Sequence, residues 1–103
     1  MSHAIVKSFA DGQLGVAKAT LYSATGQVVA EISYVNTGLA VTCNLYYLRS
    51  GGTSRRIIPE DLPLAANGGM MTCAKIGMSL GDALEGDATL ATQVDYVIEG
   101  IVE

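Results

Sequence analysis

The last quarter of the chain contains Leu80-Gly-Asp-Ala-Leu-Glu-Gly-Asp-Ala-Thr-Leu90, followed by Val94-Asp-Tyr-Val-Ile-Glu-Gly-Ile-Val102. In the second run Val94, Tyr96 and Ile98 share one face of an extended chain, because side chains alternate across a strand. The run therefore predicts a closing strand. Its Gly100 permits a bulge or a close approach of another backbone.

Two Gly-Asp steps precede this closing strand. Gly81-Asp82 predicts a turn, and Gly86-Asp87 is expected to interrupt the strand that runs from Ala83 to Leu90. The acidic cluster around these steps lacks the alternating oxygen ligands and the terminal Glu of a calcium loop. We therefore interpret its carboxylates as turn residues and surface charge.

Two strongly alternating runs lie upstream of these turns. In residues 27–36, Val28, Ala30, Ile32 and Tyr34 share a face, and residues 41–49 repeat the pattern. Asn36-Thr37-Gly38 supplies a turn between the two runs. The short link predicts that they form an antiparallel pair.

The remaining segments also favour short strands. Residues 3–9 are a strand or an arm that ends at Asp11-Gly12-Gln13, and the second half of residues 14–24 is a strand. Leu62 and Leu64 flank Pro63 as in an edge strand, and residues 70–76 form another strand that Gly77 breaks or bulges. No segment has convincing amphipathic helical spacing.

Seven or eight short strands at this spacing predict an all-β fold, an antiparallel β-sandwich, with a jelly roll as one form of it. A chain of 103 residues fits one domain. We divide it into an N-terminal arm or first strand, residues 1–13, and a β-sandwich domain, residues 14–103.

The charge balance excludes some functions. A net charge of −4 with six Lys and Arg argues against a nucleic-acid surface. No apolar run is long enough to cross a membrane, and the first residues lack the pattern of a signal peptide, so we expect a soluble protein made in the cytosol. Only 16% of the residues are charged, which indicates that another molecule covers part of the surface.

The sequence offers no constellation for catalysis. Its one histidine, His3, lies near the N-terminus, and no Ser or Cys has another histidine to activate it. Neither double glycine has the Lys-Ser/Thr of a phosphate-binding loop. Cys43 and Cys73 are expected to be buried free thiols, with a disulfide between them as the alternative. We expect no enzyme activity, no cofactor and no metal.

Several segments, in their order along the chain, resemble a small β-sandwich domain that recurs in bacteriophage virion proteins. The resemblance covers roughly residues 19–103. It implies a structural particle protein without catalysis, and no functional residue transfers with it. The chain departs from the pattern at residues 23–26, where similar sequences commonly have a proline-containing turn. The segments that carry it are 20–22, 32–37, 41–47, 57–59, 62–64, 80–82 and 94–101.

A single domain without coiled coil or repeat fits a capsid decoration (cement) protein better than a fibre. Its acidic character suits the outer head surface, because packaged DNA would repel it. The expected location is the virion, and the expected partners are a homo-oligomer, favoured as a trimer, and the major capsid protein or another virion protein. The alternative is a tail, fibre or vertex module that uses the Ser50–Ser54 loop for host adhesion.

The expected partner contacts lie in two places. Arg55 and Arg56 follow the polar loop and can form bidentate bonds to a carboxylate, although an ordinary solvated loop is the alternative. In the N-terminal arm, His3, Ile5 and Phe9 are expected to reach an adjacent subunit.

Overall fold

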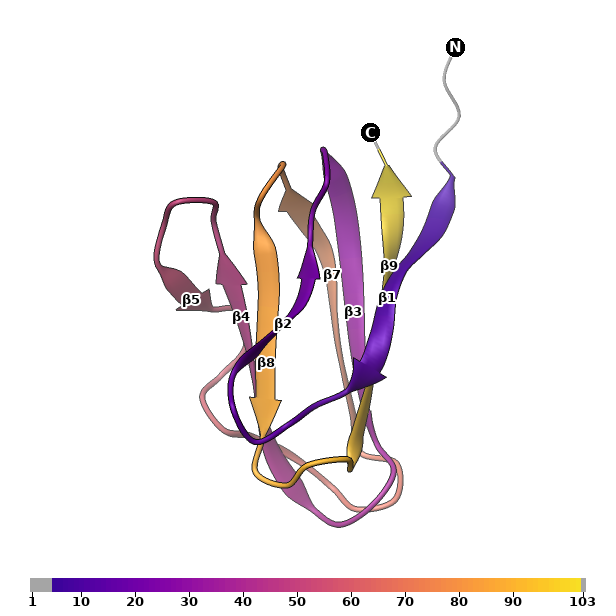
Figure 1. Ribbon diagram of the computed structural model, residues 1–103. Coiled ribbons are helices and arrows are strands. Elements are labelled where there is room, and N and C mark those ends of the chain that lie inside the picture. Colours follow the sequence, from indigo (N-terminus) through magenta and orange to yellow (C-terminus); the bar gives the residue numbers. More distant parts are fainter. Residues whose placement is uncertain (1–4, 103) are drawn as a thin grey trace.

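The computed structural model describes residues 5–102 and shows two antiparallel β-sheets without a helix in that range. Figure 1 shows the strands as a compact stack with β1 and β9 at one side and β5 at the other. The predicted all-β sandwich is confirmed. Its strands are β1 (Val6–Gln13), β2 (Ala19–Ser23), β3 (Val28–Asn36), β4 (Val41–Leu48), β5 (Ser54–Arg56), β6 (Leu62–Leu64), β7 (Met70–Met78), β8 (Ala83–Ala88) and β9 (Val94–Val102).

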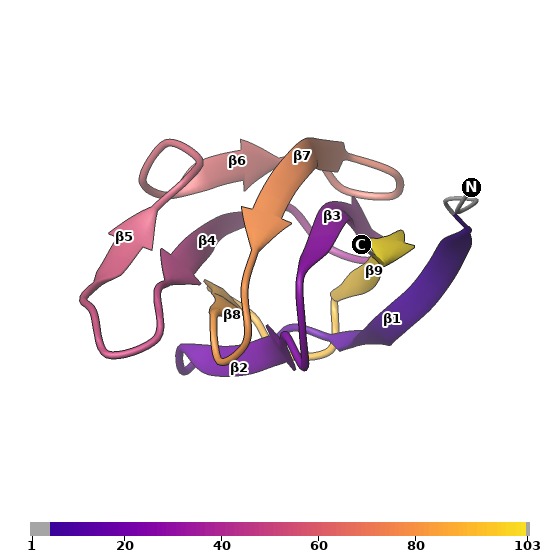
Figure 2. The ribbon, with the colours of Figure 1, turned by 90° about the horizontal axis from the view of Figure 1, so that it is seen from above.

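The strand pairing is that of a long hairpin rolled up on itself. β1 pairs with β9, β2 with β8, β3 with β7, and β4 with both β5 and β6. Rolling adds the pairs β3–β9 and β4–β8. Sheet A therefore has the order β1-β9-β3-β7 and sheet B the order β2-β8-β4-β5, which is a jelly-roll topology. Figure 2 shows the two groups of strands from above.

The core lies between the sheets and follows the predicted alternation. Every second residue of β3 is buried, from Val28 through Tyr34, and Val41, Cys43 and Leu45 of β4 face them. The Tyr34 hydroxyl donates to the backbone carbonyl of Asn44 across the core, 3.0 Å away. Each fully buried aliphatic side chain contributes roughly 2 kcal/mol, so these two strands supply much of the stability.

The predicted antiparallel pair of β3 and β4 is wrong. β3 lies between β9 and β7 in sheet A, whereas β4 belongs to sheet B, so residues 37–40 cross from one sheet to the other. The buried Asn36 side chain holds this crossing: it donates to the carbonyls of Leu39 and Ala65 at 2.7 and 3.0 Å and accepts the Gly38 amide. Alternation reveals which face of a strand is buried, but it does not reveal the neighbouring strand.

Two predicted interruptions are also wrong. β1 continues through Asp11-Gly12-Gln13, because all three residues pair with β9. β8 continues through Gly86-Asp87, because both pair with β4. A Cβ at position 86 would collide with the Tyr34 hydroxyl, so this glycine provides room for a core tyrosine and does not end the strand.

The predicted close approach at Gly100 is confirmed, since a Cβ there would overlap the carbonyl oxygen of Val29. The bulge in β7 lies at Ala74-Lys75 and not at Gly77, which pairs normally with Val29. Lys75 adopts a positive φ of 60° at the bulge. A positive φ is uncommon for a lysine.

Leu62-Pro63-Leu64 is the short edge strand β6, as predicted. Cys43 and Cys73 are free thiols in different sheets, as predicted for their oxidation state, but only Cys43 is buried and Cys73 is partly exposed. Burial of Cys43, followed by the charge of Asp87, raises the pKa of its thiol to about 11. Residues 6–13 form β1 of sheet A.

Candidate interaction surfaces

The outer face of sheet A carries apolar side chains on all four strands. The register places them there, because residues directly opposite one another on paired strands share a face. Val6 and Met70 are 65% and 64% exposed, and Val97 is 47% exposed. An antiparallel sheet with one face in water normally has polar residues on that face. The six apolar residues are Val6, Val29, Val35, Met70, Val97 and Ile101.

A hollow of about 310 Å³ lies on this outer face. Val6, Val29 and Ile101 line its apolar part. Glu31 and Glu99 stand directly opposite one another on β3 and β9 and line the rest of it with residues that include Lys75 of the bulge. Two carboxylates in this position repel each other, so the face combines apolar surface with a pair of like charges beside Lys75.

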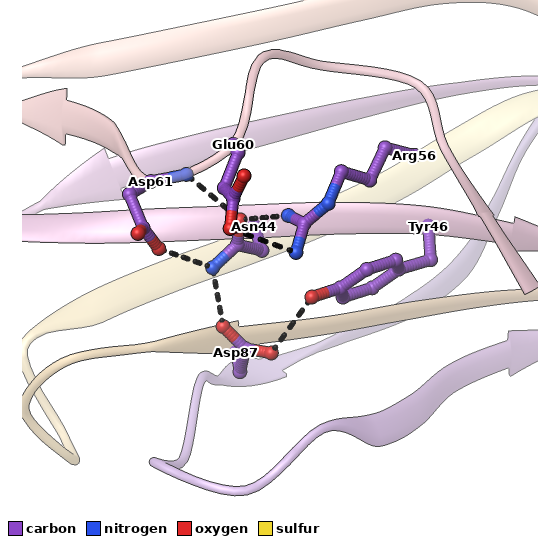
Figure 3. A network of polar contacts seen from close by, with 6 residues as sticks. All are labelled: Asn44, Tyr46, Arg56, Glu60, Asp61 and Asp87. Atoms are coloured by element: carbon purple, nitrogen blue, oxygen red, sulfur yellow. Dashed lines mark hydrogen bonds and ion pairs between the residues drawn. The ribbon is translucent and has the colours of Figure 1, made fainter.

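The outer face of sheet B has a different character, because a polar network organised by Asn44 covers it (Figure 3). The Asn44 amide nitrogen donates to Asp61 at 3.1 Å and to Asp87 at 2.9 Å. Its side-chain oxygen accepts the Asp61 backbone amide at 2.9 Å and a guanidinium N–H of Arg56. Asn44 is only 7% exposed, so its four hydrogen bonds satisfy the whole side-chain amide away from water.

The network extends from Asn44 to the aromatic ring of Tyr46. The ammonium group of Lys18 and the guanidinium group of Arg56 lie 4.6 and 4.9 Å from the centre of that ring. Arg56 also faces Glu60, with 3.7 Å between guanidinium nitrogen and carboxylate oxygen. Its charge is therefore balanced within the chain.

The structure separates the two arginines that the sequence places together. Arg56 pairs with Tyr46 on the outside of sheet B, whereas Arg55 pairs with Tyr47, whose side chain faces the other way. Arg55 lines an open cleft of about 440 Å³ together with Tyr47, Arg49 and residues of the 52–57 segment. Arg55 thus lines the same cleft as Arg49, which sequence adjacency did not indicate.

Asp82 is a structural residue that the sequence analysis interpreted as surface charge. The predicted turn at Gly81-Asp82 is confirmed, since the Asp82 amide donates to the carbonyl of Ser79. The expected surface charge is wrong for Asp82, because only 6% of the residue is exposed. Its carboxylate accepts the Tyr47 hydroxyl at 2.6 Å and the amides of Ser50 and Ser79 at 2.8 and 2.9 Å. These bonds, the tyrosine first, lower the pKa of Asp82 to about 2. The carboxylate joins the start of β8 to the end of β4.

The three expected contacts of the N-terminal segment differ in position. His3 lies outside the described residues. Ile5 is 62% exposed just before β1. Phe9 is half-buried, and its ring stacks on Tyr22 with 5.0 Å between ring centres and 7° between planes. The Phe9 ring therefore already has an aromatic partner within the chain.

Two other kinds of site are absent from residues 5–102. No group of three or more His, Cys, Asp or Glu residues there is arranged to hold a metal ion. That part of the chain also has no helix of the length and apolarity needed to cross a membrane.

Comparisons with known proteins do not assign a function to the chain. No family model matches the chain, and no curated protein matches it. Its fold is similar to part of a chain in a solved structure of infectious bursal disease virus, Gt strain, with a TM-score of 0.42 and 13% sequence identity. The similar region covers 96% of this chain and 32% of the viral one.

Proposed function

We propose that the chain is a non-enzymatic structural protein of a bacteriophage virion, and specifically a capsid decoration protein on the outer head surface. The observation that carries the proposal is the outer face of sheet A, where six apolar side chains are presented outside a core that is already complete. The register places Val6, Ile101 and Val29 in one row and Val35 with Met70 in another, with Glu31 and Glu99 between them. Exposed apolar residues in this number on one sheet face favour a contact with another protein. The segments that resemble phage virion domains, taken in their order along the chain, support the phage assignment.

The polar groups of the described residues also support a role without catalysis. Asn44 has no free hydrogen-bonding capacity, and Arg56 is committed to Asn44, Tyr46 and Glu60. Asp82 has a pKa of about 2 and accepts three hydrogen bonds, so it is a poor proton donor or acceptor near neutral pH. These groups therefore stabilise the fold.

The proposed partners are further copies of the chain, favoured as a trimer, and the major capsid protein. Closing a ring through the outer face of sheet A would cover its apolar residues. The remaining surface is acidic overall, which suits a position outside the head, where it does not face packaged DNA.

The alternative function is a tail, fibre or vertex module for host adhesion. One observation favours it: the Ser50–Ser54 loop borders the cleft that contains Arg49 and Arg55. Exposed loops on a rigid sandwich commonly bind ligands.

Copy number in the particle tests the proposal and separates it from the alternative. We expect quantitative mass spectrometry of purified virions that encode this chain to find it at hundreds of copies per particle. A handful of copies would favour the tail or vertex module. Absence of the chain from washed particles would overturn both.

A matched pair of variants tests the proposed contact face. Val97→Lys places a charge on the outer face of sheet A, and Thr20→Lys places the same charge on the outer face of sheet B. We expect Val97→Lys to abolish self-association in sedimentation equilibrium, with Thr20→Lys unchanged and both variants folded by circular dichroism. Equal self-association of the two variants would show that the outer face of sheet A does not form the contact.

A further inference from the structure

The cleft beside the Ser50–Ser54 loop has the features of a ligand site that the proposed contact face on sheet A does not require. We propose that it binds a carboxylate-bearing sugar, with Arg49 and Arg55 as the groups that hold the carboxylate. This inference goes beyond the proposed function, because it concerns the isolated chain and applies wherever the protein lies in a particle.

Local structure brings the two arginines to one cleft. Arg49 follows β4 directly, and the β4–β5 pairing places Arg55 opposite Tyr47. The loop between them folds back tightly, since Gly51 has a φ of 73° and the Gly52 amide donates to the carbonyl of Arg49 at 2.7 Å. The backbone of the loop is thus ordered before any ligand binds, which lowers the entropic cost of binding.

The charges in the cleft are only partly balanced within the described residues, because Arg49 helps to lower the pKa of the Asp82 carboxyl without forming an ion pair with it. Within residues 5–102 the only ion pair joins Arg56 to Glu60, so neither Arg49 nor Arg55 has a carboxylate within 4.0 Å. The neighbouring Asp82 already accepts bonds from Tyr47, Ser50 and Ser79. A ligand carboxylate would supply the missing acceptor, and the planar guanidinium fork matches it with two parallel hydrogen bonds.

The walls of the cleft favour a sugar over a protein side chain. Tyr47 and Ile57 provide apolar surface for the ring of a sugar, and the Thr53 hydroxyl can bond to one of its hydroxyl groups. A volume of about 440 Å³ is in the range of small-molecule sites. An acidic protein surface would instead have to approach a chain of net charge −4, whereas an acidic monosaccharide has a single charge.

The test uses the full-length ¹⁵N-labelled protein and sodium glucuronate as the probe, followed by NMR. We expect the Arg49 and Arg55 side-chain signals and the loop amides to shift in a saturable way, and neutral glucose to cause no such shift. Arg49→Gln and Arg55→Gln should each weaken the affinity by at least about tenfold, which corresponds to one lost charged contact. Lys75→Gln, the same charge change on sheet A, should leave the affinity within about twofold, because rim charges far from a site contribute little.

Three results would overturn the inference. Equal shifts with sodium sulfate at the same ionic strength would indicate an unspecific anion effect. Tighter binding of an acetylated Glu-containing peptide than of glucuronate would assign the cleft to a protein ligand. Absence of any chemical-shift change at Arg49 and Arg55 would show that glucuronate does not bind in the cleft. None of these results depends on copy number in the particle or on self-association. The proposed function is therefore tested independently of the cleft.

Discussion

The outer faces of the two sheets differ in whether their side chains bind one another within the chain. On sheet B, polar side chains bind one another through Asn44, so the face is complete without a partner. On sheet A, the corresponding positions expose Val6, Met70 and Val97 and place Glu31 opposite Glu99. A face whose polar side chains bind one another contributes to stability. A face with exposed apolar side chains and adjacent like charges is available for binding. The difference therefore separates residues that the fold needs from residues that a partner needs.

The largest effect is expected from removing the centre of the sheet B network. Asn44→Ala would leave Asp87, Arg56 and the Asp61 amide without their partner, and it should lower the free energy of unfolding by about 3 kcal/mol. Asp61 has a positive φ of 50°, which the two bonds to Asn44 help to maintain. Urea unfolding measures the change.

The matched control lies on the outer face of sheet A. Ser33 has only a long contact to Thr72, 3.5 Å between the two hydroxyl oxygens. Ser33→Ala should change the free energy of unfolding by less than about 0.5 kcal/mol. Similar losses in the two variants would show that the faces do not differ in their contribution to stability.

An intermediate effect is expected from acid, through Asp82 at the edge of sheet B. Its folded pKa of about 2 lies below the ordinary value of 3.8, so the ionised carboxylate stabilises the folded state. That contribution is fully present above about pH 4 and is lost as the pH falls through 2, with an upper limit of about 2 kcal/mol. Thermal unfolding between these pH values should show the loss in the wild type.

Asp82→Asn provides the control for this titration. An asparagine cannot ionise, so the variant should be less stable at neutral pH and should lose less stability on acidification. If the variant and the wild type lost stability in parallel down to pH 2, about the folded pKa, another carboxylate would be responsible.

The sequence was sufficient for the parts of the fold that depend on alternation. The buried face of β3, the edge position of β6 and the close approach at Gly100 could all be predicted, because each depends on the residue itself and its immediate neighbours. The neighbour of β3 could not be predicted, since Asn36 forms its bonds with Leu64 and Ala65, far along the chain.

The candidate surfaces were harder to predict for the same reason. Arg55 and Arg56 are adjacent in sequence, but β-strand alternation directs their side chains to opposite sides. Arg55 lines one cleft with Arg49 only because β5 folds back on β4. Asp82 looked like an ordinary turn residue, and only the tertiary contact with Tyr47 accounts for its burial. The exposed apolar face needed the strand register, which alternation alone does not define.

The smallest effect, and the most direct test of the contrast between the faces, is a difference in sign between two charge removals. Glu99→Gln on sheet A removes the repulsion with Glu31 and should raise the free energy of unfolding by about 0.3 kcal/mol. Glu85→Gln on sheet B weakens the bond from the Ser54 hydroxyl, 2.7 Å long, and should lower it by about 0.5 kcal/mol. Urea unfolding at low salt resolves the two signs, and about 0.5 M NaCl should reduce the Glu99→Gln gain because it screens exposed charges. A loss of stability in both variants would mean that the Glu99 carboxylate has a stabilising partner within the fold. The contrast between the two faces would then not extend to their charged residues.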